Sequence, residues 1–196
     1  MTPHAQHLKS ALEEHAAALE RLSRPRPGWV YASPLAFLLT HGQPYVPIGR
    51  PPWLPVGVPK ACFANALFLA VWFDLQYVEG YGLLALGGEA AHAMPHAWVS
   101  NGTGVAWEVT TPAPWLAYFG MPFSVERADD AMWWGDSCVL DDFQRGYPLL
   151  RERWTGDKPL KNYRPSPGLR RLRQHKRQGG RLFGTLPRQG GPGSSD

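Results

Sequence analysis

The sequence has few cysteines and no hydrophobic run long enough to cross a membrane. Its 196 residues include two cysteines, Cys62 and Cys138, which are too few for a framework of several disulfides. The longest apolar stretch, residues 61–73, is shorter than the ~20 residues that a transmembrane helix needs. The first residues, MTPHAQHLKSALEEH, lack the apolar segment of a secretory signal. We therefore expect a cytoplasmic protein without a membrane segment, in which both cysteines remain thiols.

Glycine and proline are abundant, with 21 and 20 residues, but hydrophobic residues make up 44% of the chain and aromatic residues 12%. This composition predicts one modest core in a loop-rich domain. Apolar residues at spacings of three and four predict an amphipathic helix over residues 3–22, which we expect to pack on the body rather than to form a dimerisation arm. The predicted organisation is an N-terminal helical arm (1–28), an α+β domain (29–154) and a basic, Gly/Pro-rich tail (155–196).

Charge is unevenly distributed along the chain. The formal net charge is +4, yet residues 155–196 hold ten lysines and arginines against two aspartates, so the first 154 residues are slightly acidic. A basic appendage of this kind can bind phosphate, an anionic polymer or an acidic protein surface. Aromatic residues are scarce in it, so nucleic acid would be held through its phosphates and lost with rising salt. The alternative is a solvated, disordered tail without a partner.

Cys62 lies where cysteine nucleophiles are usually found. A helix is predicted over residues 60–75, with Pro59 suited to its first turn and Cys62 in that same turn. Unpaired backbone N–H groups and the positive end of the helix dipole favour a thiolate there. The alternative is that Cys62 is a small buried hydrophobic residue, as many free cysteines are. Three predicted strands follow the helix, at residues 76–81, 96–100 and 105–110. A helix followed by antiparallel strands indicates an α+β fold.

Two ionisable residues lie on adjacent predicted strands in the segment PHAWVSNGTGVAWEVTTP. His96 on the first strand can take the proton of a thiol, and Glu108 on the second can orient the imidazole. Side chains alternate along a strand, so a two- or four-residue turn would place His96 and Glu108 on opposite faces. A three-residue loop, 102–104, with Gly104 in the left-handed conformation places them on one face. The triad hypothesis therefore predicts that loop.

Three further residues are candidates for binding the substrate or its oxyanion. Gln43 and Tyr45 precede the cysteine in a proline-rich segment and can donate hydrogen bonds to an oxyanion together with the Cys62 N–H. Asn65 lies one helical turn after Cys62 and can contact the site. The alternative for Asn65 is a polar spot on a buried helix.

Glu79 and Trp98 complete the list of substrate candidates. Glu79 lies in an aromatic strand, where it is either a second acid near the site or an outward-facing carboxylate. Trp98 offers a stacking surface, or else serves as core mass, as tryptophan usually does. His92 is an alternative base because it lies four residues before His96. A metal site built from His92, His96 and Cys62 lacks convincing ligand spacing.

Several segments together resemble a known group of proteins, namely PKACFANA, YVEGYGLL, PHAWV, WEVT and AYFGMPFS. They resemble a family of small proteins of phages and actinobacteria, which is similar to the papain-like and transglutaminase-like superfamily of thiol enzymes. The resemblance covers residues 59–124, about a third of the chain. It implies a central cysteine-bearing helix packed on an antiparallel sheet, with Cys62 as nucleophile, His96 as base and Glu108 as orienting group. It also implies a location in the host cytoplasm or the virion if the protein is phage-encoded.

We therefore expect a cysteine-dependent hydrolase or acyltransferase that acts on an amide or peptide-type bond through Cys62, His96 and Glu108. No cofactor is implied, no metal site is expected, and no membrane contact is expected. The competing hypothesis is a non-catalytic phage or bacterial interaction protein whose residues 155–196 bind nucleic acid or an acidic partner. Nothing in the loops that flank Cys62 identifies a substrate.

Overall fold

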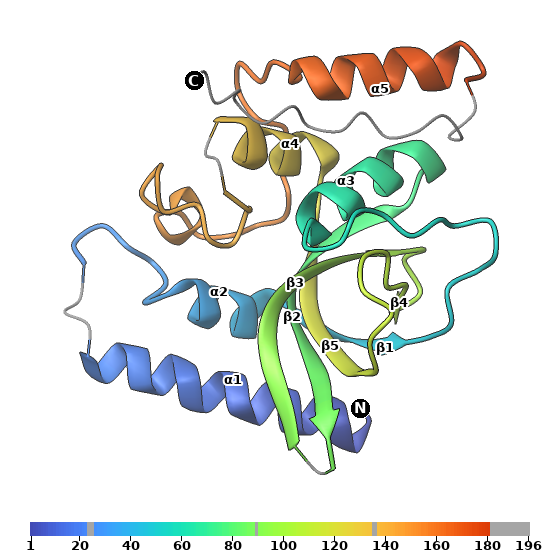
Figure 1. The fold of residues 1–196 in the computed structure, drawn as a ribbon. Helices are drawn as coiled ribbons and strands as arrows, with labels where there is room; N and C mark the ends of the chain where they lie inside the picture. Colours follow the sequence, from blue (N-terminus) through green and yellow to red (C-terminus); the bar gives the residue numbers. More distant parts are fainter. Residues whose placement is uncertain (23–25, 89, 135–136, 181–196) are drawn as a thin grey trace, which may run out of the picture.

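The computed structural model describes residues 1–22, 26–88, 90–134 and 137–180, which form a mixed α+β fold (Figure 1). The predicted α+β class is confirmed. The α-helices are α1 (Pro3–Leu22), α2 (Pro34–His41), α3 (Cys62–Phe73), α4 (Val125–Trp134) and α5 (Pro167–Arg177). The strands are β1 (Gln43–Pro47), β2 (Gln76–Gly87), β3 (Ala90–Ser100), β4 (Val105–Ala106) and β5 (Trp115–Phe123), and a short 3-10 turn, η1, covers Pro148–Leu150. Within these residues no helix combines the length and the apolar character needed to cross a membrane.

The five strands form one sheet that curls on itself. Their order is β3-β2-β5-β1-β4, with β4 parallel to β1 and the other neighbours antiparallel. A bridge between Val99 of β3 and Trp107, the residue after β4, joins the two outer strands at one end. The curl gathers one side chain from each strand into a small cluster on the inner face, formed by Tyr45, Val78, Trp98, Ala106 and Tyr118. Gly120 permits this curvature, because a Cβ atom there would collide with the ring of Trp98.

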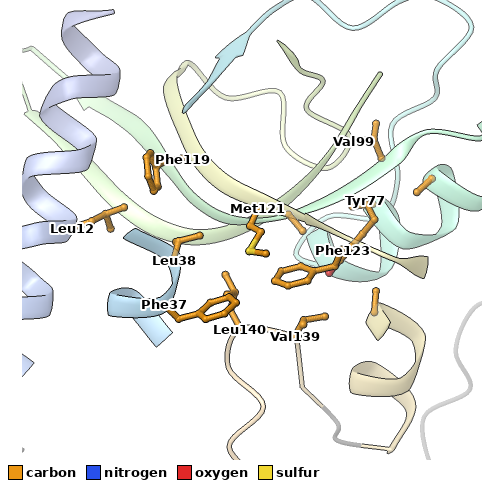
Figure 2. Packing of buried hydrophobic residues seen from close by; sticks show 14 of the residues in the cluster. Leu12, Phe37, Leu38, Tyr77, Val99, Phe119, Met121, Phe123, Val139 and Leu140 are labelled. Atoms are coloured by element: carbon orange, nitrogen blue, oxygen red, sulfur yellow. The ribbon is translucent and has the colours of Figure 1, made fainter. Parts of the chain in front are cut away.

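The larger core lies on the outer face of the sheet, which the helices cover. Helix α1 packs against β5 and α2, and α3 packs against β3 and β2. Figure 2 shows Phe119, Met121 and Phe123, alternate residues of β5, turned into this core beside Phe37 and Leu140. The sheet therefore has two apolar faces, one closed by its own curl and one closed by helices.

The N-terminal helix has the predicted bounds, Pro3–Leu22, and packs on the body as expected. Leu8, Leu12 and Ala16 are buried on the face that meets β5 and α2. The apolar stripe that could have served a partner helix is thus used inside the chain.

Residues 155–180 fold back onto the body. For this part of the predicted tail, the alternative of a solvated, disordered segment is wrong. Nε of Arg127 on α4 donates to Asp157 at 2.6 Å, and the Ser166 N–H donates to Asp129 at 2.8 Å. Helix α5 then lies along α3 (Figure 1). These contacts join residues about 30 to 40 positions apart, which local composition does not reveal. The remainder of the predicted basic tail lies outside the described residues.

Several elements differ from the sequence-based prediction. Strands β1 and β5 and helix α4 were not predicted, and β2 and β3 are longer than expected. Pro44, Pro47 and Pro122 lie within β1 and β5, where proline normally argues against a strand because it has no N–H to donate. The predicted strand at 105–110 is regular only at Val105–Ala106.

Candidate active site

Cys62 is the first residue of α3, and its neighbours leave the helix end open. Lys60 has a left-handed backbone, with a φ angle of 66°, so the chain turns sharply just before the helix. Pro59 therefore precedes the helix instead of lying in its first turn, which corrects the prediction. Ala61 is the N-cap and offers no capping side chain, so no side chain competes for the first N–H groups. The partly exposed Cys62 thus lies at the positive end of the helix dipole.

His96 lies between Cys62 and Glu108. It is 4% exposed, and its Nε2 atom lies 2.6 Å from Oε2 of Glu108. Burial lowers the pKa of His96, but hydrogen bonds with the Cys62 thiol and the Glu108 carboxylate, and their negative charges, raise it overall from 6.5 to about 9. Because Nε2 is bound to Glu108, Nδ1 is the ring nitrogen left for Cys62. The structure thus brings together three of the residues selected from the sequence, which we call the triad.

Glu108 is held at both carboxylate oxygens. His96 and the Tyr118 hydroxyl bind Oε2 at 2.6 and 2.8 Å, and the N–H groups of Thr110 and Thr111 donate to Oε1 at 2.6 and 2.8 Å. Burial raises the pKa of Glu108, but the hydrogen bond and charge of His96, together with the other donors, lower it overall. A carboxylate bound at both oxygens cannot rotate freely, so it fixes the plane of the imidazole.

The loop that follows β3 has the register that the triad hypothesis requires. The bridge pairs Val99 with Trp107, which is the pairing that the predicted three-residue loop gives. Neither a two-residue nor a four-residue turn would pair these two residues. Gly104 has a φ angle of 79°, the left-handed conformation expected of it. With this register His96 and Glu108 share the inner face of the sheet.

Two aromatic residues of β5, Trp115 and Tyr118, complete the site. Trp115 stacks on the His96 ring, with centroids 4.4 Å apart and an interplanar angle of 26°. The Tyr118 hydroxyl donates to Glu108, and burial and the charge of Glu108 raise the pKa of Tyr118, which keeps the donor protonated. The register with β2 shifts between Trp115 and Ala117, and this bulge puts Trp115 on the face of Tyr118. Strict alternation along the strand would have put Trp115 on the opposite face.

Asn65 connects the helix that carries Cys62 to the loop that holds Glu108. Its side-chain amide accepts from the Val58 N–H at 3.0 Å, and donates to the Val58 carbonyl at 2.7 Å and to Thr110 Oγ1 at 2.9 Å. The Thr110 N–H in turn donates to Glu108. Asn65 is 8% exposed and its amide is used by the protein itself. It is therefore a positioning residue, and the substrate role considered for it is not supported.

Glu79 is fully buried on the outer face of the sheet, so it is neither an outward-facing carboxylate nor a contact of His96. The hydroxyl of Tyr77 and the N–H groups of Val139 and Leu140 donate to its two oxygens. Burial raises the pKa of Glu79, although these donors oppose the shift. Burial and the charge of Glu79 also raise the pKa of the nearby Cys138 thiol. Glu79 thus anchors the segment after Cys138 to the sheet.

The other residues singled out from the sequence are not members of the triad. Trp98 is fully buried in the inner cluster, so it offers no stacking surface to a substrate. Tyr45 is 1% exposed and packs against Trp98, and its hydroxyl accepts from Gln43 Nε2 at 3.0 Å. The Tyr45 hydroxyl is engaged by Gln43 and its ring by Trp98, so an oxyanion role for these two residues is not supported. His92 is exposed on β3, four extended residues or about 13 Å from His96.

A groove of about 330 Å³ lies on the outer face of the sheet, and its lining includes no member of the triad. Phe63, the residue after Cys62, and Pro95, the residue before His96, both line it. Helices α1 and α2, strand β2 and the segment from Cys138 onward form the rest of its walls. In the described part of the chain, no group of three or more His, Cys, Asp and Glu side chains is arranged to hold a metal ion.

A second groove, of about 520 Å³, lies between α3, α4 and α5 and contains no member of the triad. Two of the three basic residues in its lining are engaged by acidic ones: Arg173 binds Glu126, and Lys176 lies 2.7 Å from Asp74. These pairs neutralise part of the positive charge of residues 155–180. That charge was the reason to consider this segment as a surface for nucleic acid or an acidic partner.

The chain was compared with protein-family models, curated proteins and solved structures. No family model matches it, and neither the curated proteins nor the solved structures give a significant match. The functional argument is therefore based on the geometry of the site.

Proposed function

We propose that this protein is a cysteine-dependent hydrolase or acyltransferase of papain-like or transglutaminase-like type, acting on amide or peptide bonds. The observation that supports this most strongly is the order of groups at the site: Cys62 at a helix N-terminus, His96 beside it, and Glu108 bound to the far nitrogen of the imidazole. A thiol, an imidazole and a carboxylate in this order supply a nucleophile, a general base and an orienting group.

The first half of the reaction forms a thioester. The sulfur of Cys62 attacks the substrate carbonyl carbon while its proton resides on Nδ1 of His96. The N–H groups at the start of α3 stabilise the resulting oxyanion. His96 then gives the proton to the leaving nitrogen as the C–N bond breaks, and the acyl group stays on sulfur.

The second half releases the acyl group. Water, or an amine in the case of transfer, attacks the thioester carbonyl and gives a proton to His96. The C–S bond breaks, and the released thiolate shares that proton with the imidazole again. Glu108 remains ionised throughout and stabilises the imidazolium, in keeping with the raised pKa of His96 and the lowered pKa of Glu108.

An acyl-transfer assay with p-nitrophenyl acetate tests the proposal without knowledge of the natural substrate. We expect a stoichiometric burst of p-nitrophenol and an acetyl group on the peptide that contains Cys62, found by mass spectrometry. Cys62→Ala removes the burst, whereas Cys138→Ala, the matched control, retains it. A burst that survives Cys62→Ala, or acetylation divided equally between the two cysteines, contradicts the proposal.

A further inference from the structure

Helix α5 has one side against the body and one side in solvent (Figure 1). Leu169 is buried on the inner side, which packs against α3. Arg170, Arg171, Gln174 and Arg177 are exposed. Positions 170, 174 and 177 follow one another at the spacing of a helical turn, and position 171 is next to them, so the four side chains share the outer side. The three arginines extend over about 10 Å of the helix axis.

Acidic residues of the body neutralise the cations on the inner side of α5 but not those on its outer side. The two inner cations form the ion pairs with Glu126 and Asp74 described above. Arg171 and Arg177 form no ion pair with any residue that the structure describes. Arg170 donates one N–H to a backbone carbonyl, which leaves its other N–H groups and its charge available. The positive charge that remains is therefore gathered on the solvent side of the helix.

The sequence around these arginines adds positive charge and no negative charge. Residues 158–180 contain eight lysines and arginines and no aspartate or glutamate. Lys161 and Arg164, in the segment before α5, are exposed as well. An anionic partner would therefore meet no repelling carboxylate from this segment.

The side chains on the outer side also indicate which anionic partner fits. Guanidinium groups bind phosphate oxygens through paired N–H donors. The sequence of α5, PGLRRLRQHKR, has no Phe, Tyr or Trp on which the bases of a single strand could stack. Its buried leucine faces the body, so the helix presents no apolar face to a lipid bilayer. A nucleic-acid duplex, with its phosphates outside and its bases paired inside, suits this surface best.

We propose that the outer side of α5 binds double-stranded nucleic acid through its phosphates, without reading the base sequence. Arg170, Arg171 and Arg177 each contact a phosphate, and the Gln174 amide donates between them. This surface is independent of the proposed catalytic function. Lys176 of α5 meets Asp74, the C-cap of α3, whereas Cys62 begins that helix at its other end.

Fluorescence anisotropy of a labelled DNA duplex, titrated with the full-length protein at a series of NaCl concentrations, tests the inference. Three phosphate contacts contribute about −2.7 to the slope of the logarithm of the binding constant against the logarithm of the salt concentration. In the triple variant Arg170→Gln, Arg171→Gln and Arg177→Gln, we expect the slope to become shallower by about that amount. The affinity at about 50 mM NaCl falls at least roughly tenfold.

Two triple variants serve as controls. Lysine at positions 170, 171 and 177 keeps the charge, so the slope stays close to that of the wild type. Arg21→Gln, Arg26→Gln and Arg153→Gln together remove the same charge from exposed arginines outside residues 155–180, and the slope again stays close to that of the wild type.

Several results would overturn the inference. One is the absence of binding by the wild type at about 50 mM NaCl, and another is an equal loss in the two glutamine variants, which would report net charge alone. Tighter binding to single-stranded DNA, to poly-L-glutamate or to vesicles of anionic lipid than to the duplex would contradict the assignment to a duplex.

A single substitution gives a second test that does not depend on the folding of the triple variant. Arg171→Glu reverses one exposed charge and leaves the inner side of α5 intact. We expect the slope to become shallower by about one or more. An unchanged slope in Arg171→Glu would overturn the inference.

Discussion

Two clusters in this protein each place a cysteine near a glutamate and a tyrosine, and they differ in that only one of the two contains the imidazole ring of a histidine. The first is the triad with Tyr118, on the inner face of the sheet, and the second is Cys138 with Glu79 and Tyr77, on the outer face. In the second cluster, ionising Cys138 would place two negative charges together in a buried site, so its pKa is raised. In the first, His96 lies between the thiol and the carboxylate, and its contacts with both raise its own pKa. The two clusters therefore differ in whether an imidazole that can hold a proton lies beside the cysteine.

Access does not explain the expected difference between the two cysteines. Both side chains are partly exposed to solvent. A difference in their reactivity toward a small electrophile therefore reports the chemical surroundings of each sulfur, and four experiments test the two clusters through reactivity or stability.

Removing the imidazole is expected to have the largest effect. His96→Gln takes away the base and lowers the alkylation rate of Cys62 by iodoacetamide at pH 7 by about a hundredfold. The rate at Cys138 changes less than about twofold, because the groups that shift the pKa of Cys138 are carboxylates and backbone, and His96 is not among them. Quantitative mass spectrometry of the two cysteine peptides measures both rates. His92→Gln, on the same strand, is the matched control, and an equal fall at both cysteines in His96→Gln would indicate a lost fold instead.

Changing the acid of the second cluster acts on stability. In Glu79→Gln an amide N–H₂ replaces one carboxylate oxygen and faces the N–H of Leu140 or Val139 as a second donor. We expect a loss of about 2 kcal/mol in the free energy of unfolding, measured by urea denaturation. Cys138 also becomes more reactive, because the charge that raises its pKa is gone. Unchanged stability with unchanged Cys138 reactivity would contradict the anchoring role of Glu79.

The pKa of His96 makes stability depend on pH. Because this pKa is about 9 in the folded protein and 6.5 is the ordinary value, the folded state binds the proton more tightly. The stabilisation is complete below pH 6.5 and is lost as pH rises through 9. We expect the free energy of unfolding of the wild type to fall relative to that of His96→Gln between pH 6.5 and pH 9.5, as measured by urea denaturation at a series of pH values. Parallel curves for the two proteins would show that His96 has no raised pKa.

Breaking the link between α3 and the Glu108 loop is the mildest change. Thr110→Val preserves shape and the backbone N–H to Glu108 but removes the acceptor of Asn65 Nδ2. We expect a loss of about 1 kcal/mol in the free energy of unfolding. Thr111→Val is the matched control, because Thr111 contributes to Glu108 through its backbone. If the two substitutions lowered the free energy of unfolding equally, the hydrogen bond from Asn65 to Thr110 would have no specific stabilising role.

The parts of the site that local rules determine were predictable from the sequence. A cysteine at a helix start and an alternating hairpin with Gly104 in a left-handed turn were sufficient to select Cys62, His96 and Glu108 and to predict the loop that joins the last two. What escaped prediction depends on long-range geometry. The bulge that turns Trp115 onto His96 breaks the alternation, and the curl that buries Trp98 appears in no local pattern.

The same distinction applies to the fold. Helix α1 was predicted with its bounds, because its apolar stripe is periodic. The packing of residues 155–180 was not predicted, because it depends on contacts of Asp129 and Asp157 with partners 30 or more positions away in the chain. Strands β1 and β5 were not predicted, because both contain prolines, which normally argue against a strand. One of them, β5, is the middle strand of the sheet.

The relative alkylation rates of Cys62 and Cys138 in the wild-type protein test the central claim most directly. The unmodified protein is treated with a limiting amount of iodoacetamide at pH 7, and both cysteine peptides are quantified over time. The account predicts that Cys62 reacts about a hundredfold faster or more, because only Cys62 has an imidazole to accept its proton. Slow labelling at equal rates would contradict it.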